Sequence, residues 1–166
     1  MRILFLDIDG VLNAHEPFDP VVGCGRIYHD KVEQLNRVLV ATGANLILSS
    51  AWRYQILNGW CTIEGFSWLL RTHGVLGGRL LGHTAADTMH DGAWDGIPGS
   101  WPIHNERGKQ IADWWLAHPE FRGDRYAVVD DLDLGISEAG HPFVQTNGKV
   151  GLTDVDADKL ITLLQG

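Results

Sequence analysis

A short apolar run that ends in two acidic residues constrains this chain more than any other feature. Residues 3–6 are all apolar, and Asp7, Asp9 and Gly10 follow at once. An apolar run of this length, bounded by a turn signal, indicates a buried strand of a parallel sheet. Two carboxylates two residues apart lie on the same side of an extended chain, and Gly10 lets the backbone turn away. Since ligands of open α/β sheets bind beyond the carboxyl ends of the strands, both acids are expected at a binding site.

The spacing of these two acids suits phosphoryl chemistry. Close carboxylates repel each other, so they are tolerated where a cation lies between them or where one keeps its proton. Mg²⁺ binds one or two protein carboxylates together with waters and phosphate oxygens. One Asp can attack phosphorus, and the other can protonate the leaving oxygen. Two solvated loop acids are the plainer alternative, which the apolar strand directly before them disfavours.

Composition places the chain among ordinary globular proteins and excludes several other classes. Its 166 residues, 45% apolar and 20% charged, predict a single domain over residues 1–166. No run is long enough to span a membrane, and no signal-peptide pattern is present. Cys24 and Cys61 give neither a disulfide framework nor a metal-binding spacing, so we expect reduced thiols and a cytoplasmic protein. The net charge of −8 disfavours tight, sequence-independent binding to nucleic acid.

Two further apolar runs, residues 46–48 and 126–129, also end abruptly in polar residues. A helical pattern over residues 30–42 precedes the first of them, which predicts a βαβ unit with parallel strands. The carboxyl ends of parallel strands share one edge of the sheet. The polar residues expected near Asp7 at that edge are Ser49, Ser50, Asp130 and Asp131.

The remaining elements complete an α/β fold with a doubly wound parallel sheet and helices on both faces. Short strands are expected over residues 77–82 and 142–146. The three other helices are expected over residues 64–72, over residues 105–118 and after Thr153 or Asp154. Asp30 and Asn105 are predicted as the N-caps of their helices.

Four segments resemble the motifs of one family, and they occur in that family's order over residues 7–131. Residues 7–12, Asp-Ile-Asp-Gly-Val-Leu, resemble the first motif of the haloacid dehalogenase (HAD) superfamily in its phosphatase form. Ser49 is similar to the hydroxyl residue of the second motif, residues 107–111 to the basic third motif, and the Asp pair at 130–131 to the fourth. The resemblance implies a Rossmann-like sheet, a small or minimal cap and a Mg²⁺-dependent phosphatase.

The resemblance also implies roles for the acidic residues. Asp7 would be the nucleophile that forms an aspartyl-phosphate, and Asp9 would protonate the leaving alcohol and then activate water. Mg²⁺ would be bound by Asp7, by the carbonyl of Asp9 and by Asp130, while Asp131 either joins these ligands or orients the basic residue.

Several candidate phosphate and substrate ligands remain open from the sequence. Ser49 is preferred as the phosphate ligand, with Ser50 as the alternative. The family pattern Lys-Gly-x-Ala-Leu places Arg107 where a lysine is usual, so Arg107 and Lys109 are both kept. The residues expected to contact substrate are Trp52 and Arg53, although Arg53 could equally form a surface salt bridge.

The segment from about residue 54 to residue 104 is the least legible part of the chain. It holds few periodic signals after its first helix, and we interpret it as a possible small lid to which Trp94 and Trp101 could belong. His83, His90 and His104 lie in or beside it, but their spacing fits no known metal-binding pattern.

The substrate is the least determined part of the prediction. A nucleotide or another small phosphomonoester is the first hypothesis. The runs Asp-Ile-Asp-Gly-Val-Leu-Asn, Ser-Ser-x-Trp-Arg and Arg-Gly-x-x-Ile-x-x-Trp are similar to small HAD domains associated with nucleic-acid repair proteins. A phosphatase acting on the 3′ or 5′ end of a polynucleotide is therefore the alternative, and an inactive HAD-like binding module is the second alternative. No pattern indicates an oligomeric state.

Overall fold

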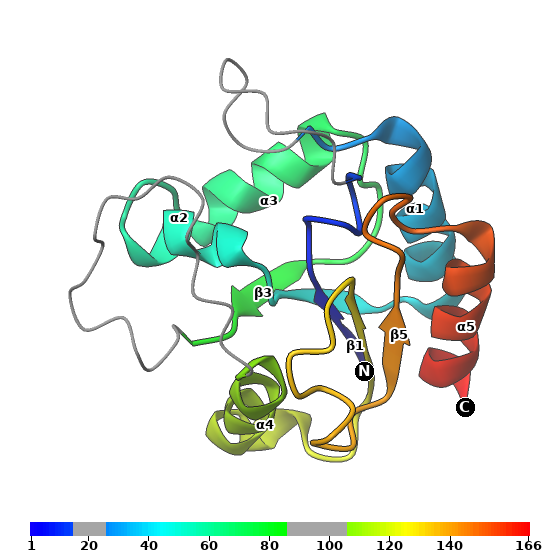
Figure 1. The fold of residues 1–166 in the computed structure, drawn as a ribbon. Helices are drawn as coiled ribbons and strands as arrows, with labels where there is room; N and C mark the ends of the chain where they lie inside the picture. The colour runs from blue at the N-terminus through cyan, green and yellow to red at the C-terminus, as the bar shows by residue number, and fades with distance from the viewer. Residues whose placement is uncertain (15–25, 86–105) are drawn as a thin grey trace.

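The centre of the molecule is a parallel β-sheet with the strand order β3-β2-β1-β4-β5. The computed structural model describes residues 1–14, 26–85 and 106–166. Within them, five strands form this sheet: β1 (Arg2–Leu6), β2 (Asn45–Leu48), β3 (Leu80–His83), β4 (Arg125–Asp130) and β5 (Phe143–Gln145). All four strand pairs are parallel, which confirms the prediction. Figure 1 shows β1 near the centre of the molecule, with β3 and β5 on opposite sides of it.

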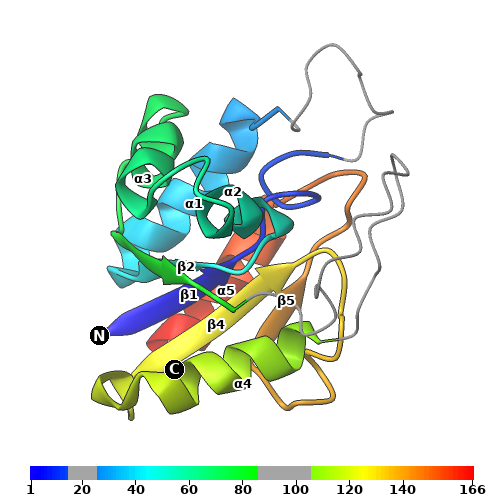
Figure 2. The ribbon, with the colours of Figure 1, turned by 90° about the vertical axis from the view of Figure 1, so that its left-hand side faces the viewer.

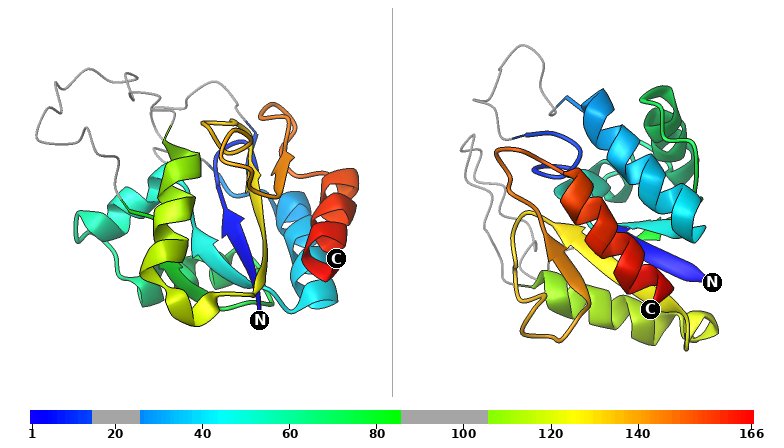
Figure 3. Two further views of the ribbon diagram at one scale, coloured as in Figure 1. Left: turned by 90° about the horizontal axis from the view of Figure 1, so that it is seen from below. Right: turned by 90° about the vertical axis from the view of Figure 1, so that its right-hand side faces the viewer.

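Helices cover both faces of the sheet, as a doubly wound α/β fold requires. The described helices are α1 (His29–Thr42), α2 (Tyr54–Leu57), α3 (Ile63–Thr72), α4 (Arg107–Ala117) and α5 (Asp154–Gln165), with short 3₁₀ turns η1 (Ala51–Arg53) and η2 (Pro119–Phe121). Figure 2 shows α4 on one side of the sheet and α1 and α3 on the other. In Figure 3, α5 lies beside α1. The guanidinium of Arg37 on α1 ion-pairs with Asp158 on α5 at 2.7 Å.

The alternation of side chains along β1 divides the core into two layers. Leu4 and Leu6 are buried in the layer beneath α1, α3 and α5, whereas Ile3 and Phe5 are buried in the layer beneath α4. A strand that is apolar on both faces is the expected result when helices cover both sides of a parallel sheet. The same alternation sends Asp7, two residues beyond Phe5, toward the α4 side.

The predicted helix ends are partly wrong. Helix α1 begins at His29 with Tyr28 in the N-cap position, so Asp30 lies inside the first turn and is not the cap. The reason is a tertiary contact, because the backbone N–H of Tyr28 donates to the carbonyl of Leu12 and fixes where the chain enters the helix. At α5 the prediction is confirmed, since Thr153 and Asp156 form a reciprocal capping box.

The segment predicted as a lid contains part of the sheet itself. Of residues 54–104, those up to residue 85 are described, and they form α2, α3 and β3, which is the crossover from β2 to the next strand of the sheet. Trp94, Trp101, His90, His104 and the predicted cap Asn105 lie outside the described residues, as does Cys24. Helix α4 starts at Arg107, and Glu106 is its N-cap residue without a side-chain capping bond.

None of the helices in residues 1–14, 26–85 and 106–166 is both long and apolar enough to cross a membrane.

Candidate active site

The carboxyl ends of β1, β2 and β4 bring the predicted acids and hydroxyls together. Leu6 at the end of β1 lies in register with Leu48 of β2 and Val129 of β4. The ladder continues one residue further, because the N–H of Asp7 donates to the Val129 carbonyl at 3.0 Å and the N–H of Ser49 donates to the Leu6 carbonyl at 2.9 Å. Asp7 and Ser49 are therefore neighbours at the edge where ligands of such sheets bind.

Three carboxyl groups converge at this edge in an arrangement that could hold a metal ion. Asp7, Asp130 and Asp131 each offer a carboxylate oxygen, and these oxygens lie within 4.8 Å of one another. All three side chains are buried, with Asp131 the most exposed at 9%. Hard oxygen ligands in a small cluster suit Mg²⁺, which takes one or two carboxylates and fills the rest of its shell with water and phosphate oxygens. The side chain of Asp9 is not part of this group.

Arg107 is the basic residue that faces the acid cluster. Its Nη1 lies 2.7 Å from Oδ2 of Asp130 and 3.6 Å from Oδ1 of Asp7. Lys109 instead pairs with Asp113 at 2.5 Å on the outer face of α4, where its side chain is 63% exposed. Of the two basic candidates, the geometry places Arg107 in the site and Lys109 outside it.

A close contact at the start of α4 puts Arg107 in this place. Its neighbour Gly108 lies so near the loop after β4 that an added Cβ would come within 2.1 Å of the Gly135 carbonyl oxygen. The N–H of Gly108 donates to the Leu134 carbonyl at 3.2 Å. The carbonyl of the same residue accepts a hydrogen bond from Nε2 of His141 at 2.8 Å. The Arg-Gly pair of the third motif thus combines a charge with the small residue that lets the helix dock.

Burial and repulsion between neighbouring carboxylates raise the pKa values of two acids of the cluster. Burial raises the pKa of Asp7 well above its usual value of 3.8, and the charges of Asp130 and Asp9 raise it further, while Arg107 and a hydrogen bond from Ser50 act in the opposite direction. Burial also raises the pKa of Asp130, against the lowering effect of Arg107. A divalent cation between these oxygens would stabilise the ionised forms and offset the repulsion that adds to the effect of burial in both shifts.

Gly10 lets the chain pass through the crowded region next to the acids. Its φ is 71°, which favours glycine, and an added Cβ would lie 2.5 Å from Cγ of Asp131. The hydroxyl of Thr146, which follows β5, donates to the Gly10 carbonyl at 2.7 Å. The turn after the first motif is therefore held from the far edge of the sheet, through a residue that no sequence pattern singles out.

Asp9 is held at both carboxylate oxygens by neutral donors. Nδ2 of Asn13 donates to Oδ1 at 2.8 Å, and the indole Nε1 of Trp52 donates to Oδ2 at 2.9 Å. Trp52 is one of the residues predicted to contact substrate, and in the structure its indole N–H contacts the catalytic candidate Asp9. Asn13 was not predicted as a site residue. Its signal is its place in the turn that ends the first motif, four residues after Asp9.

The two serines after β2 differ in what their hydroxyls contact. The Ser50 side chain forms a hydrogen bond with Asp7, and its Oγ accepts the N–H of Trp52 at 3.3 Å. The Oγ of Ser49 is buried and has no hydrogen-bond partner in the described part of the chain, and the same is true of Oγ1 of Thr84. Thr84 lies next to Ser49, because its N–H donates to the Leu48 carbonyl just beyond β3. A buried hydroxyl without a partner costs about 1–3 kcal/mol of folding free energy. Such a group is typically retained because it binds a ligand.

Arg53 is buried inside the protein and bonded to it. Its side chain is 1% exposed. The guanidinium donates to the carbonyls of Ser50 and Ala85 at 2.8 and 3.0 Å and to Oε1 of Gln110 at 3.3 Å. These bonds tie η1 to the end of β3 and to α4, so the geometry favours a structural role over the predicted substrate contact and over a surface salt bridge.

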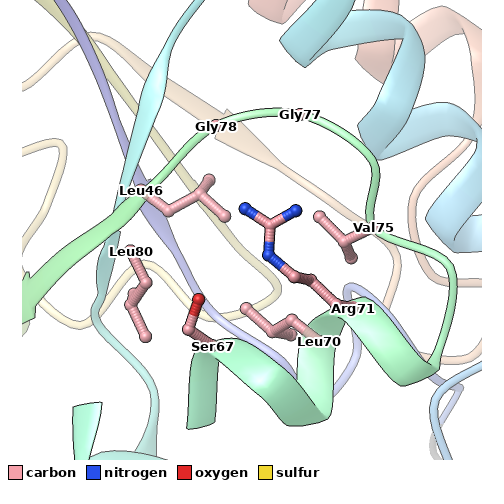
Figure 4. Close-up of a pocket in the computed structure, with 8 residues that line it drawn as sticks. All are labelled: Leu46, Ser67, Leu70, Arg71, Val75, Gly77, Gly78 and Leu80. Carbon is pink, nitrogen blue, oxygen red and sulfur yellow. The ribbon is translucent and has the colours of Figure 1, made fainter. Parts of the chain in front are cut away.

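A small pocket elsewhere in the molecule does not belong to this site. Figure 4 shows it between α3 and the first residues of β2 and β3, with Leu46 and Leu80 on its sheet side and the Arg71 side chain reaching across it. It therefore opens near the amino ends of the strands, away from the acids at their carboxyl ends.

Comparison with known protein families agrees with this geometry. Residues 3–157 match the family model for the HAD domain in Swiss Army Knife RNA repair proteins. The matched range includes every site residue described above. Among curated proteins and among solved structures, no match to the chain was found.

Proposed function

Because the chain belongs to the family of HAD domains found in Swiss Army Knife RNA repair proteins, we propose that it is a Mg²⁺-dependent phosphomonoesterase in which Asp7 is the nucleophile. The observation that carries the proposal is the buried group of Asp7, Asp130 and Asp131 with Arg107 beside it. A buried cluster of like charges is costly for folding, and it is useful where a cation and a phosphate must be held together.

The reaction follows from the positions of two acids. Asp7 attacks phosphorus in line with the leaving oxygen, so that an Asp7–phosphorus bond forms as the ester bond breaks. Asp9 gives its proton to the leaving oxygen. In the second half, Asp9 accepts a proton from water as that water attacks the aspartyl-phosphate, which releases inorganic phosphate and restores Asp7.

The remaining groups stabilise the transferring phosphoryl group. Mg²⁺, held by Asp7, Asp130 and Asp131 with the Asp9 carbonyl as a further ligand, would supply positive charge to the phosphoryl oxygens. Arg107 has the charge and the fork of N–H donors to bind a phosphoryl oxygen while it neutralises Asp130. Ser49 is the preferred hydroxyl ligand, because its Oγ has no partner among the described residues, whereas that of Ser50 is engaged by Asp7 and Trp52.

The family favours an RNA end as substrate over a free nucleotide. The matched family model is that of a domain in RNA repair proteins, and an RNA end that carries a terminal phosphate is itself a phosphomonoester. The net charge of −8 limits how much of the RNA backbone the protein can bind. Recognition is then confined to the terminal phosphate and its nearest nucleotides. The same negative charge supports the second candidate, a phosphatase for free mononucleotides.

One assay tests both the reaction class and the substrate. Phosphate release is measured with Mg²⁺ or with EDTA on 3′- and 5′-mononucleotides, on sugar phosphates and on RNA oligonucleotides with a 3′- or a 5′-phosphate. We expect Mg²⁺-dependent release that is fastest on one of the RNA ends. A preference for mononucleotides would replace the first substrate class with the second. No release from any substrate by the folded protein would overturn the phosphatase proposal in favour of an inactive binding module.

A further inference from the structure

Trp52 and Asn13 bond to opposite oxygens of Asp9 from two different segments of the chain. We propose that both are positioning residues, which fix the Asp9 carboxyl group for proton transfer to the leaving oxygen. This inference rests on the proposed function of Asp9 as general acid and base, and it assigns Trp52 a role other than contact with substrate.

The position of the Asn13 side chain is set by the turn that follows the first motif. The side chain is only 4% exposed. Its Oδ1 accepts the N–H of Gly10 at 2.8 Å, which leaves Nδ2 as the atom that donates to Asp9. The same turn is closed by the N–H of Leu12, which donates to the Ile8 carbonyl at 2.8 Å. The amide therefore cannot flip without losing both bonds, and the direction of its donor is fixed.

The position of the Trp52 side chain is set by η1 and by helix α3. The ring of Trp52 packs edge-on against Phe66, with centroids 6.1 Å apart and an interplanar angle of 90°. Phe66 is fully buried at the core face of α3. The backbone on either side of Trp52 is held by Ser50 and by the bonds of Arg53 described above. Packing thus fixes the indole plane, and with it the direction of the Nε1–H bond.

The choice of donors explains how the Asn13 and Trp52 side chains can hold the Asp9 carboxyl group both with and without its proton. An indole N–H and an amide N–H are uncharged donors that do not titrate in the working range. They orient the Asp9 carboxyl group without placing a cation beside it, in contrast to Arg107 at Asp130. Each oxygen keeps a second lone-pair position, which can carry the proton. As the ester bond breaks, its electron pair goes to the leaving oxygen, the Asp9 O–H bond breaks and a new O–H bond forms on the leaving group.

The substitution Trp52→Phe removes the indole donor and keeps an aromatic ring against Phe66. Trp68→Phe is the matched control, because Trp68 lies on α3 with 68% of its surface exposed. The readout is kcat/KM with Mg²⁺ for an aryl phosphate, whose leaving group needs no proton, and for an alkyl phosphate, whose leaving group does. This ratio of constants reports the steps up to departure of the leaving group and excludes hydrolysis of the intermediate.

We expect Trp52→Phe to lower kcat/KM for the alkyl phosphate by about tenfold, the size of a lost hydrogen bond to a charged group, and to leave the aryl phosphate within about twofold. Asn13→Ala should give the same asymmetry, and Trp68→Phe should change neither constant. An equal loss on both substrates would show a structural effect and would overturn the assignment, as would no loss on either.

A structural measurement separates failure of this inference from failure of the proposed function. If the unmodified protein hydrolyses neither substrate, the phosphatase proposal fails. Crystal structures of the protein and of Trp52→Phe then test whether the Trp52 side chain holds Asp9 in one conformation. A single Asp9 side-chain conformation that becomes several in the variant supports the positioning role. An unchanged Asp9 conformation in Trp52→Phe overturns it.

Discussion

The two halves of the site are built from opposite kinds of chemical groups. At the ends of β1 and β4, the ionisable side chains of Asp7, Asp130 and Arg107 are buried, and Arg107 lies beside both acids. At the ends of β2 and β3, the side chains that face inward are hydroxyls and an indole, with Arg53 turned into the protein as the one exception among the residues compared. The first half could bind a cation and a phosphate, and the second could position the groups that move protons.

The difference between the halves lies in how each one is stabilised. Buried like charges destabilise a fold until a ligand neutralises them, so we expect a bound metal ion to stabilise the β1–β4 half. In the β2–β3 half the Trp52 indole already has a partner in the protein, so it can be rigid without a ligand, whereas the Ser49 and Thr84 hydroxyls have no partner among the described residues. Changes in the charged half should therefore remove chemistry, while changes in the neutral half should weaken orientation or folding.

The largest effect is expected at Asp7. Asp7→Asn removes the proposed nucleophile, so phosphate release should fall to background. The variant should remain folded and, without metal, at least as stable, because burial and Asp130 already penalise the charged form of Asp7. Phosphate release and thermal unfolding measure the two effects. Asp113→Asn, at an exposed position of α4, is the control, and near-normal turnover of Asp7→Asn would remove Asp7 as nucleophile.

Replacement of Asp9 should be the next most harmful change. Asp9→Asn removes the group that donates and accepts the proton, and the loss in kcat should be about 10² to 10⁴, as is usual for a general acid–base. The variant is compared with the unmodified protein by steady-state kinetics under saturating substrate and Mg²⁺. A loss smaller than about tenfold would refute the role of Asp9 and would make its two hydrogen bonds purely structural.

Substitutions of the two basic residues at the start of α4 test whether Arg107 acts in the site and Lys109 does not. Arg107→Ala removes the ion-pair partner of Asp130 and the proposed phosphate ligand, so kcat/KM should fall by about 10² to 10³. Lys109→Ala should stay within about twofold, since an exposed ion pair such as Lys109–Asp113 contributes little. Comparable losses in both variants would mean that the start of α4 moves when substrate binds.

The sequence predicted that Asp7, Asp130 and Asp131 would lie together at one edge of the sheet, because charge and spacing are properties of short segments. An apolar strand that ends in Asp7 and Asp9, and another that ends in Asp130 and Asp131, can only meet at one edge of a parallel sheet. The choice between Arg107 and Lys109 needed the structure, since it depends on the contact of Gly108 with the loop at Gly135, a contact between residues 27 positions apart.

The neutral half and some helix starts could not be predicted, because their roles are set by partners far along the chain. Trp52 reaches Asp9 only after η1 folds over the end of β2. Arg53 finds its carbonyl partners at Ser50 and Ala85, where the sequence suggested a surface or a substrate. The start of α1 is fixed by the bond from Tyr28 to Leu12, which overrides the capping preference of Asp30.

Metal binding should stabilise the protein by an amount that depends on pH. In the metal-free protein, the raised pKa values of Asp7 and Asp130 make the folded state hold protons more tightly than the unfolded state. Stability therefore falls as pH rises from 3.8 through these raised values. Mg²⁺ requires the ionised forms, so its stabilisation should grow over the same range. At a hundredfold excess over Kd it should add about 2.7 kcal/mol, or roughly 5–10 °C in Tm.

Thermal unfolding with and without Mg²⁺ at about pH 5 and about pH 7.5 measures this linkage. The increment in Tm should be larger at the higher pH, and it should disappear in Asp130→Asn, which removes one carboxylate of the cluster. An increment that is equal at both values of pH, or that survives in Asp130→Asn, would place the ion somewhere other than between these acids.

The smallest effect on catalysis, and one that could break the contrast between the halves, is expected at Arg53. Arg53→Lys keeps the charge but loses the planar fork that reaches Ser50, Ala85 and Gln110 together. The free energy of unfolding should fall by about 1–3 kcal/mol, while KM should change by less than about twofold. Urea unfolding and substrate titration measure the two quantities. Arg37→Lys, which alters an exposed pair with Asp158, is the matched control and should change neither.

If KM of Arg53→Lys instead rises about tenfold with stability unchanged, Arg53 leaves its buried partners to bind substrate. The neutral half would then contribute charge to phosphate binding, as the sequence alone suggested.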